Sequence, residues 1–130
     1  MKHNGLLNPE LSALVARAGH TQMIVIADAG LPIPDAVPRV DLSITAGFPD
    51  LLGVLRAILG ELVIENATVA SETRVRSAGW YAALCQDLPR APLEISHEEL
   101  KALLPNVLAV VRTGETTPYA NVVLHCGVNF

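Results

Sequence analysis

Basic residues are scarce in this sequence: nine of its 130 residues are Lys or Arg, and they stand singly along the chain. Together with 13 Asp and Glu they give a net charge of −4. Nucleic-acid binding needs a basic patch that neutralises phosphates, so this distribution argues against a nucleic-acid partner. Charged residues make up only 17% of the chain, against about 25% in an average domain, while hydrophobic residues reach 51%.

A small chain cannot bury all of these apolar side chains in its own core. The length suits one domain spanning residues 1–130, and a domain of that size exposes much of its surface. We therefore expect homo-oligomerisation through apolar interfaces. The alternative is a compact monomer with an unusually apolar surface.

Cysteine is also scarce, since Cys85 and Cys126 are the only two. Two cysteines cannot build a disulfide framework, which favours free thiols in a reducing cytoplasm. The first ten residues lack the apolar core of a signal peptide, and the longest apolar runs, 23–27 and 107–111, are too short to span a bilayer. We expect a cytoplasmic protein with no membrane partner.

The rest of the pattern alternates helices with strands. Asn8-Pro9 is a helix start, Gly19 and Gly60 are helix stops, Ser71 is a candidate N-cap, and Ser96 with Glu99 forms a capping box. We expect helices over 9–18, 50–60, 71–85 and 96–104, and strands over 23–27, 62–70, 93–95, 106–111 and 121–126. This alternation predicts an α/β fold, a three-layer α/β/α domain with a largely parallel, mixed sheet.

Two titratable residues bracket the most apolar of these strands, 23–27. His20 precedes it, and histidine exchanges protons near neutral pH. Asp28 follows it, at the strand end where ligands bind in open α/β sheets. The alternatives are a solvated turn histidine and an Asx-turn. Residues 30–34, Gly-Leu-Pro-Ile-Pro, form a stiff hook that its two prolines keep out of a sheet.

Further candidates lie in the second half of the chain. His97 stands in the first turn of a helix, where the macrodipole favours a neutral ring, and Lys101 shares its face. Tyr119 and Asn121 offer a hydroxyl and an amide, which suit sugar hydroxyls. The alternatives are an exposed histidine with a solvated lysine and an ordinary strand-entry turn.

The sequence shows no pattern typical of a metal site, a nucleotide site or a serine nucleophile. Three of the four histidines, His20, His97 and His125, and the thiol of Cys126 show no metal-binding spacing, so we expect no metal site. The sequence also lacks the phosphate-loop, dinucleotide and serine-nucleophile motifs.

Taken together, these segments resemble the D-ribose pyranases, relatives of the L-fucose mutarotases, from Leu7 to Phe130. The hook and Tyr119-Ala120-Asn121 fit the ribose branch better than the fucose branch. Residues 71–88 and the pair His125-Cys126 depart from the family pattern. The segments that carry the resemblance are 19–21, 28–34, 39–42, His97 with Lys101, 112–115, 118–121 and 127–130.

The resemblance implies a cytoplasmic isomerase that interconverts the β-pyranose and β-furanose forms of D-ribose by acid/base ring opening and reclosure. It implies no cofactor, no metal, and a ring-shaped homo-oligomer, a decamer of two stacked pentamers. By resemblance His20 is the proton donor. The base that partners it stays open, since a water or Asp28 could serve equally well. The implied substrate-binding residues are Asp28, His97, Lys101, Tyr119, Ala120 and Asn121.

Other functions stay open at this stage. They are an L-fucose-type or other monosaccharide mutarotase, a sugar-binding ring without turnover, and a purely structural assembly module. Spacing adds one constraint: if residues 20–28 were all extended, His20 and Asp28 would be about 26 Å apart, too far for one small sugar. Either the chain bends back at Thr21-Gln22, or two subunits complete each pocket; we favour the second.

Overall fold

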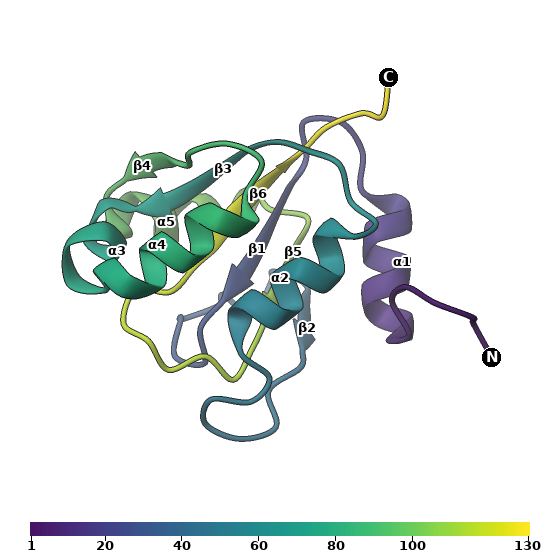
Figure 1. The fold of residues 1–130 in the computed structure, drawn as a ribbon, viewed down its shortest axis with the longest axis horizontal. Coiled ribbons are helices and arrows are strands. Elements are labelled where there is room, and N and C mark those ends of the chain that lie inside the picture. Colours follow the sequence, from purple (N-terminus) through teal and green to yellow (C-terminus); the bar gives the residue numbers. More distant parts are fainter.

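Five of the six strands run in one direction, and β6 alone runs against its neighbours. The computed structural model describes residues 1–130, with the strands in the order β2-β5-β1-β6-β3-β4 (Figure 1). The expected largely parallel, mixed sheet is thereby confirmed. The strands are β1 (Met23–Ala27), β2 (Arg39–Asp41), β3 (Ile64–Ala70), β4 (Leu93–Ile95), β5 (Ala109–Arg112) and β6 (Val122–Cys126).

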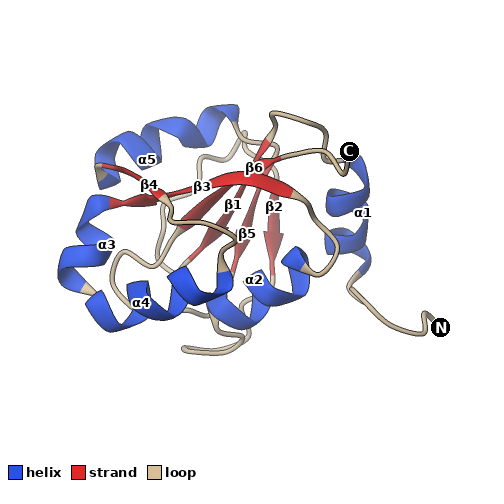
Figure 2. Cartoon of the chain, turned by 45° about the horizontal axis from the view of Figure 1, so that its top comes forward, coloured by secondary structure: helices blue, strands red, loops and turns tan.

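Helices cover both faces of this sheet (Figure 2). Alternate residues of β1 point into two separate apolar clusters: Ile24 and Ile26 pack with α1, α2 and α4, whereas Val25 and Ala27 pack with α5. The three expected layers are therefore present. The helices are α1 (Pro9–Arg17), α2 (Leu51–Leu59), α3 (Ser71–Arg76), α4 (Ala78–Asp87) and α5 (His97–Leu103), followed by the 3-10 turn η1 (Leu104–Asn106).

The helix starts agree with their capping signals. The Asn8 side chain accepts a hydrogen bond from the backbone N–H of Leu11, and both bonds of the Ser96–Glu99 capping box are present. α1 ends at Arg17 with an extended Ala18 as its C-cap, one residue before the expected glycine stop.

The expected helix over 71–85 is two helices. The backbone breaks at Ser77 (φ −135°), whose hydroxyl donates to the carbonyl of Pro118, so a contact with a distant loop overrides the local helical pattern. Ser71 is the first residue of α3 rather than its N-cap, and its hydroxyl donates to Glu72.

Two strands also differ from expectation. β5 begins at Ala109 rather than 106, because η1 occupies residues 104–106. The pattern gave no strand over Arg39–Asp41, yet β2 pairs with β5 there, at the edge of the sheet. Three residues are too few to show an alternating pattern.

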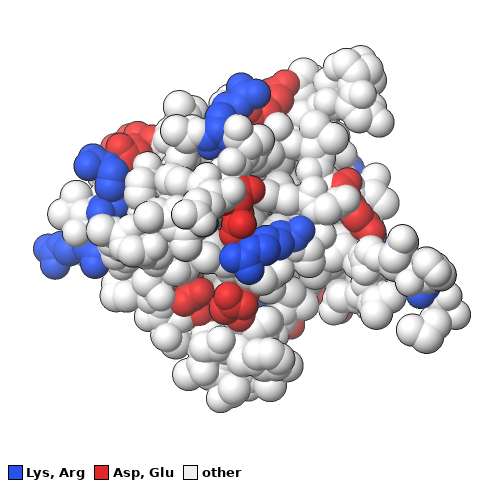
Figure 3. Space-filling view, in the orientation of Figure 1, with Lys and Arg blue, Asp and Glu red and all other residues white.

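The surface combines scattered charges with exposed apolar groups. On the face shown in Figure 3, basic side chains are spread over the surface, and several of them lie beside acidic ones. Large apolar side chains are exposed at Leu7, Ile44, Phe48, Val63, Val75, Leu93 and Phe130. None of the helices has the length and apolar character that crossing a membrane would require.

Candidate functional site

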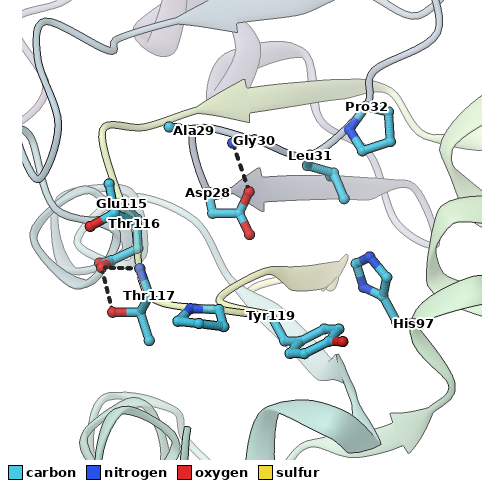
Figure 4. A pocket seen from close by; sticks show the side chains of 11 residues that line it. Asp28, Ala29, Gly30, Leu31, Pro32, His97, Glu115, Thr116, Thr117 and Tyr119 are labelled. Carbon is cyan, nitrogen blue, oxygen red and sulfur yellow. Dashed lines mark hydrogen bonds between the residues drawn. The ribbon is translucent and has the colours of Figure 1, made fainter. Parts of the chain in front are cut away.

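A pocket of about 520 Å³ opens beyond the carboxyl end of β1 (Figure 4). We call this end of the central strands the Asp28 end. In α/β sheets, this is the edge where ligands bind. The pocket is lined by Asp28, Ala29, Gly30, Leu31, Pro32, His97, Glu115, Thr116, Thr117, Pro118 and Tyr119.

The Asp28 carboxylate is fixed by neighbours on both sides. Its Oδ1 accepts from the backbone N–H of Gly30 at 2.9 Å, which forms the Asx-turn that starts the hook. Its Oδ2 accepts from the side-chain Nδ2 of Asn121 at 3.0 Å, and the side-chain Oδ1 of Asn121 accepts from the Asp28 backbone N–H at 2.8 Å. Asn121 is fully buried, so its amide works behind the pocket wall and fixes Asp28.

Tyr119 reaches the pocket through an unusual backbone conformation. Its φ is +59°, in the left-handed region that residues other than glycine seldom adopt. Its carbonyl accepts from the hydroxyl of buried Thr73 at 2.7 Å and from the backbone N–H of Asn121 at 2.9 Å. These bonds from α3 and from the start of β6 hold the strained turn.

The ring of His97 stands edge-on to that of Tyr119, with 5.1 Å between centroids and 84° between planes. Its backbone N–H donates to both oxygens of Glu72, at 3.1 and 3.2 Å. Hydrogen bonds from the backbone of Glu72 itself, and then from His97 and Ser71, lower the pKa of the Glu72 carboxyl. The His97 Nδ1 is buried without a hydrogen-bond partner, which is unusual for a polar atom inside a fold.

Glu115 ties the walls of the pocket together. Its Oε1 accepts from the backbone N–H of Leu51 at the start of α2, and its Oε2 accepts from the hydroxyl of Thr117. Its backbone carbonyl accepts from Ala29. Burial alone would raise the pKa of Glu115, but the hydrogen bonds from Leu51 and Thr117 outweigh burial and lower the pKa below its ordinary value.

Two close contacts brace the loops around this network. The Arg112 guanidinium donates to the Ala29 carbonyl at 3.0 Å and to Asp41 at 2.9 Å, which joins β2 to the start of the hook. A Cβ on Gly114 would lie 2.4 Å from the carbonyl oxygen of Phe48, so only glycine allows this approach.

The structure brings together three of the seven residues named as site candidates: Asp28, His97 and Tyr119 all line the pocket. Ala120 and Asn121 are fully buried beside it. Lys101 lies four residues after His97 on α5, outside the lining, where its ammonium pairs with Glu98 at 2.7 Å.

His20 lies beyond the opposite end of β1, which we call the His20 end. The five residues of β1, about 16 Å of extended strand, separate it from Asp28. A second hollow of about 300 Å³ opens there, and its lining includes His20, Val63 and Phe130. The imidazole Nε2 lies 2.5 Å from a carboxylate oxygen of Glu65.

Three acidic residues were not assigned a role from the sequence. Glu65 and Glu72 contact the two candidate histidines, and Glu115 lines the pocket. The signals for Glu115 were its place in a turn-rich segment and in residues 112–115, which carry the family resemblance. No group of three or more His, Cys, Asp or Glu is placed to hold a metal ion.

An α/β sheet with a polar pocket beyond the carboxyl end of a central strand is the arrangement of a small-molecule-binding α/β protein. The chain belongs to the RbsD / FucU transport protein family, whose model matches residues 1–129.

Individual relatives match the chain over its full length. It is 51% identical over 131 residues to a protein of Cutibacterium acnes named D-ribose pyranase, and 52% identical over 131 residues to one of Chloroflexus aggregans with the same name; both alignments cover 100% of each chain. Among solved structures, the fold is similar to Bacillus subtilis RbsD complexed with D-ribose, with a TM-score of 0.95, 40% identity and full coverage of both chains.

Proposed function

We propose that this chain is an isomerase, a D-ribose pyranase that interconverts the β-pyranose and β-furanose forms of D-ribose. The observation that carries the proposal is the match at about half identity, over the whole chain, to relatives named D-ribose pyranase. The pocket at the Asp28 end supports it, because a fixed carboxylate, an imidazole and a phenol suit the hydroxyls of a small sugar.

The reaction needs only proton transfers. The ring opens when a proton reaches the ring oxygen while the anomeric hydroxyl loses one, and the open-chain aldehyde recloses through the C4 or the C5 hydroxyl. A positioned acid/base group accelerates such a step roughly 10²- to 10⁴-fold. We assign His20 as the proton donor, and Asp28, His97, Lys101, Tyr119, Ala120 and Asn121 to the sugar-binding site. Asp28, His97 and Tyr119 line the pocket, whereas Asn121 acts by holding Asp28.

Each pocket is completed by a second copy of the chain. Two site groups at opposite ends of β1 cannot reach one sugar from a single chain, whereas the His20 end of one copy can face the Asp28 end of another. Both ends expose apolar side chains beside these groups. Val63 and Phe130 line the hollow that contains His20, while Ile44 lines a hollow with Ala29 and Thr116.

Contacts between unlike ends of identical chains form rings when the rotation closes. We propose a decamer of two stacked pentameric rings in the cytoplasm; the two free cysteines fit a reducing compartment. Native mass spectrometry tests the assembly, since a decamer weighs about ten times the 13.8 kDa of one chain.

The experiment that tests the function is proton NMR saturation transfer on D-ribose. Irradiating the β-pyranose anomeric signal should reduce the β-furanose signal when catalytic amounts of the protein are present. His20→Ala should abolish this transfer with ribose affinity nearly unchanged, and His3→Ala, which changes an exposed histidine outside both hollows, is the matched control. Ribose binding without transfer by the wild type would instead identify a sugar-binding ring.

A further inference from the structure

We propose that Glu65 is a positioning residue for His20, so that the proton donor of the reaction is a carboxylate–histidine pair rather than a lone histidine. This inference rests on the proposed function of His20. Its basis is the contact of 2.5 Å between the His20 Nε2 and the Glu65 Oε1, which joins residues 45 positions apart. Four further features show why the chain places the two groups together.

The first feature is a bulge in β3. The antiparallel pairing of β3 with β6 shifts register between Ile64 and Asn66, and Glu65 is the residue between them. A bulge inserts one extra residue and redirects its side chain, and bulges occur often beside active sites. In a regular ladder Glu65 would alternate with its neighbours, whereas here its side chain reaches the turn before β1.

The second feature is a glycine opposite the bulge. A Cβ on Gly127 would lie 3.0 Å from the Cγ of Glu65 and 3.3 Å from its backbone nitrogen. The backbone after β6 therefore passes so close to Glu65 that a larger residue would push its side chain away. The backbone N–H of Gly127 also donates to the carbonyl of Val63, which holds this approach in place.

The third feature is the turn that carries His20. Thr21 has φ +72°, a left-handed conformation that is rare for a β-branched residue. Its N–H donates to the carbonyl of Cys126, and the N–H of Gln22 donates to the carbonyl of Gly19. Strained turns held by surrounding hydrogen bonds are found mainly at functional sites.

The fourth feature is exposure. The side chains of His20 and Glu65 are 49% and 47% exposed, and ion pairs in that setting contribute little to folding stability. Stability therefore does not explain a bulge, a glycine and a strained turn converging on this pair. A function that requires an oriented imidazole does.

The pairing also determines which ring nitrogen meets the substrate. An ionised carboxylate only accepts hydrogen bonds, so the Nε2 of His20 carries the hydrogen that points at Glu65. The Nδ1 is then the nitrogen that faces the sugar, donates its proton to the ring oxygen, and is left as the lone-pair acceptor of the neutral ring.

The test compares Glu65→Ala, Glu65→Gln and Glu65→Asp in the full-length protein, using saturation transfer on D-ribose at several ribose concentrations. We expect Glu65→Ala to lower kcat by roughly tenfold or more, a part of the 10²–10⁴ that a positioned acid contributes, with KM within about twofold of wild type. Glu65→Asp, which keeps the carboxylate, should recover part of the loss, whereas Glu65→Gln should recover less.

The second readout is the ring nitrogen spectrum of ¹⁵N-labelled histidine. Wild-type His20 in its neutral form should be the Nε2–H tautomer, and Glu65→Ala should give a mixture of tautomers. Glu10→Gln is the matched control, because it removes an exposed carboxylate in the first turn of α1 that lines neither hollow, and it should leave kcat and the His20 signals unchanged.

The outcomes separate this proposal from the function on which it rests. Wild-type protein without ribose exchange would overturn the proposed function and this role together. Wild-type exchange with normal kcat in Glu65→Ala, or an unchanged His20 tautomer in that variant, would overturn the role of Glu65 alone. A loss of kcat in Glu65→Ala with partial recovery in Glu65→Asp would establish it.

Discussion

The two ends of β1 carry titratable groups in opposite settings. At the Asp28 end, the buried side-chain amide of Asn121 and the backbone N–H of Gly30 both donate to one carboxylate. At the His20 end, the histidine has one carboxylate partner and about half of its side chain is exposed. The difference shows that a single chain fixes the Asp28 carboxylate through several bonds, whereas the His20 imidazole has one side-chain partner.

Mixing two inactive variants gives the largest effect expected from this comparison. His20→Ala and Asp28→Asn should each lose exchange activity when expressed alone. Co-expressed in equal amounts, they should recover about a quarter of wild-type activity, because a pocket shared by two chains receives both intact groups in that fraction of cases. Saturation transfer on the mixed oligomer measures it. No recovery would mean that one chain supplies both groups, and the comparison would fail.

Gly114→Ala should damage the Asp28 end next most strongly. Its Cβ would meet backbone atoms of Phe48 at 2.4–2.6 Å, which cannot move independently of the loop. We expect a loss of about 3 kcal/mol in the free energy of unfolding, measured by chemical denaturation. Gly79→Ala is the control, because a Cβ there meets nothing within 4 Å, and this helix substitution should stabilise by roughly 0.4–1 kcal/mol.

Asn121→Ala should sharpen the comparison by uncoupling Asp28 from its support. It leaves the Asp28 N–H and one carboxylate oxygen without their buried partner, at a cost of about 2 kcal/mol. Ribose affinity measured by calorimetry should fall, while the His20 ring signals stay in place. Asn106→Ala, at an exposed position, is the control. Movement of the His20 signals in Asn121→Ala would show that the two ends are not independent.

Glu115→Gln should have the smallest effect, and one that depends on pH. Because the fold holds the pKa of Glu115 below its ordinary value of 4.5, the ionised form stabilises the fold above pH 4.5, and this contribution is lost as pH falls through the lowered pKa. The difference in free energy of unfolding between wild type and Glu115→Gln, on the order of 1 kcal/mol at pH 7, should therefore shrink in acid. Glu10→Gln, in the exposed first turn of α1, should show no such trend; a difference that persists at low pH would contradict the prediction.

Sequence patterns were sufficient where the cause of a structure is local. The apolar run 23–27 predicts a strand buried on both faces. Asn8 and Ser96 predict, as N-caps, the start of the helices that follow them. The grouping of Asp28 with Tyr119 could also be predicted, because Asp28 follows the strand β1 and Tyr119 precedes the strand β6.

Features that depend on distant partners were not visible in the sequence. The break at Ser77 follows from its bond to Pro118, and the position of Glu65 follows from a register shift between β3 and β6. Neither leaves a local pattern. The place of Lys101 was also not determined by helical spacing, since sharing a face with His97 did not bring its ammonium into the pocket lining.

The direction of β6 has a consequence for insertions and deletions. Because this strand runs against β1, it leads from Asn121 at the Asp28 end to Gly127 at the His20 end, so its five residues set the spacing between the two ends. One added residue within 122–126 would turn every following side chain to the opposite face of the sheet. Surface loops tolerate insertions and deletions far more readily. We therefore expect related proteins to differ in length within their loops and to have a β6 of the same length.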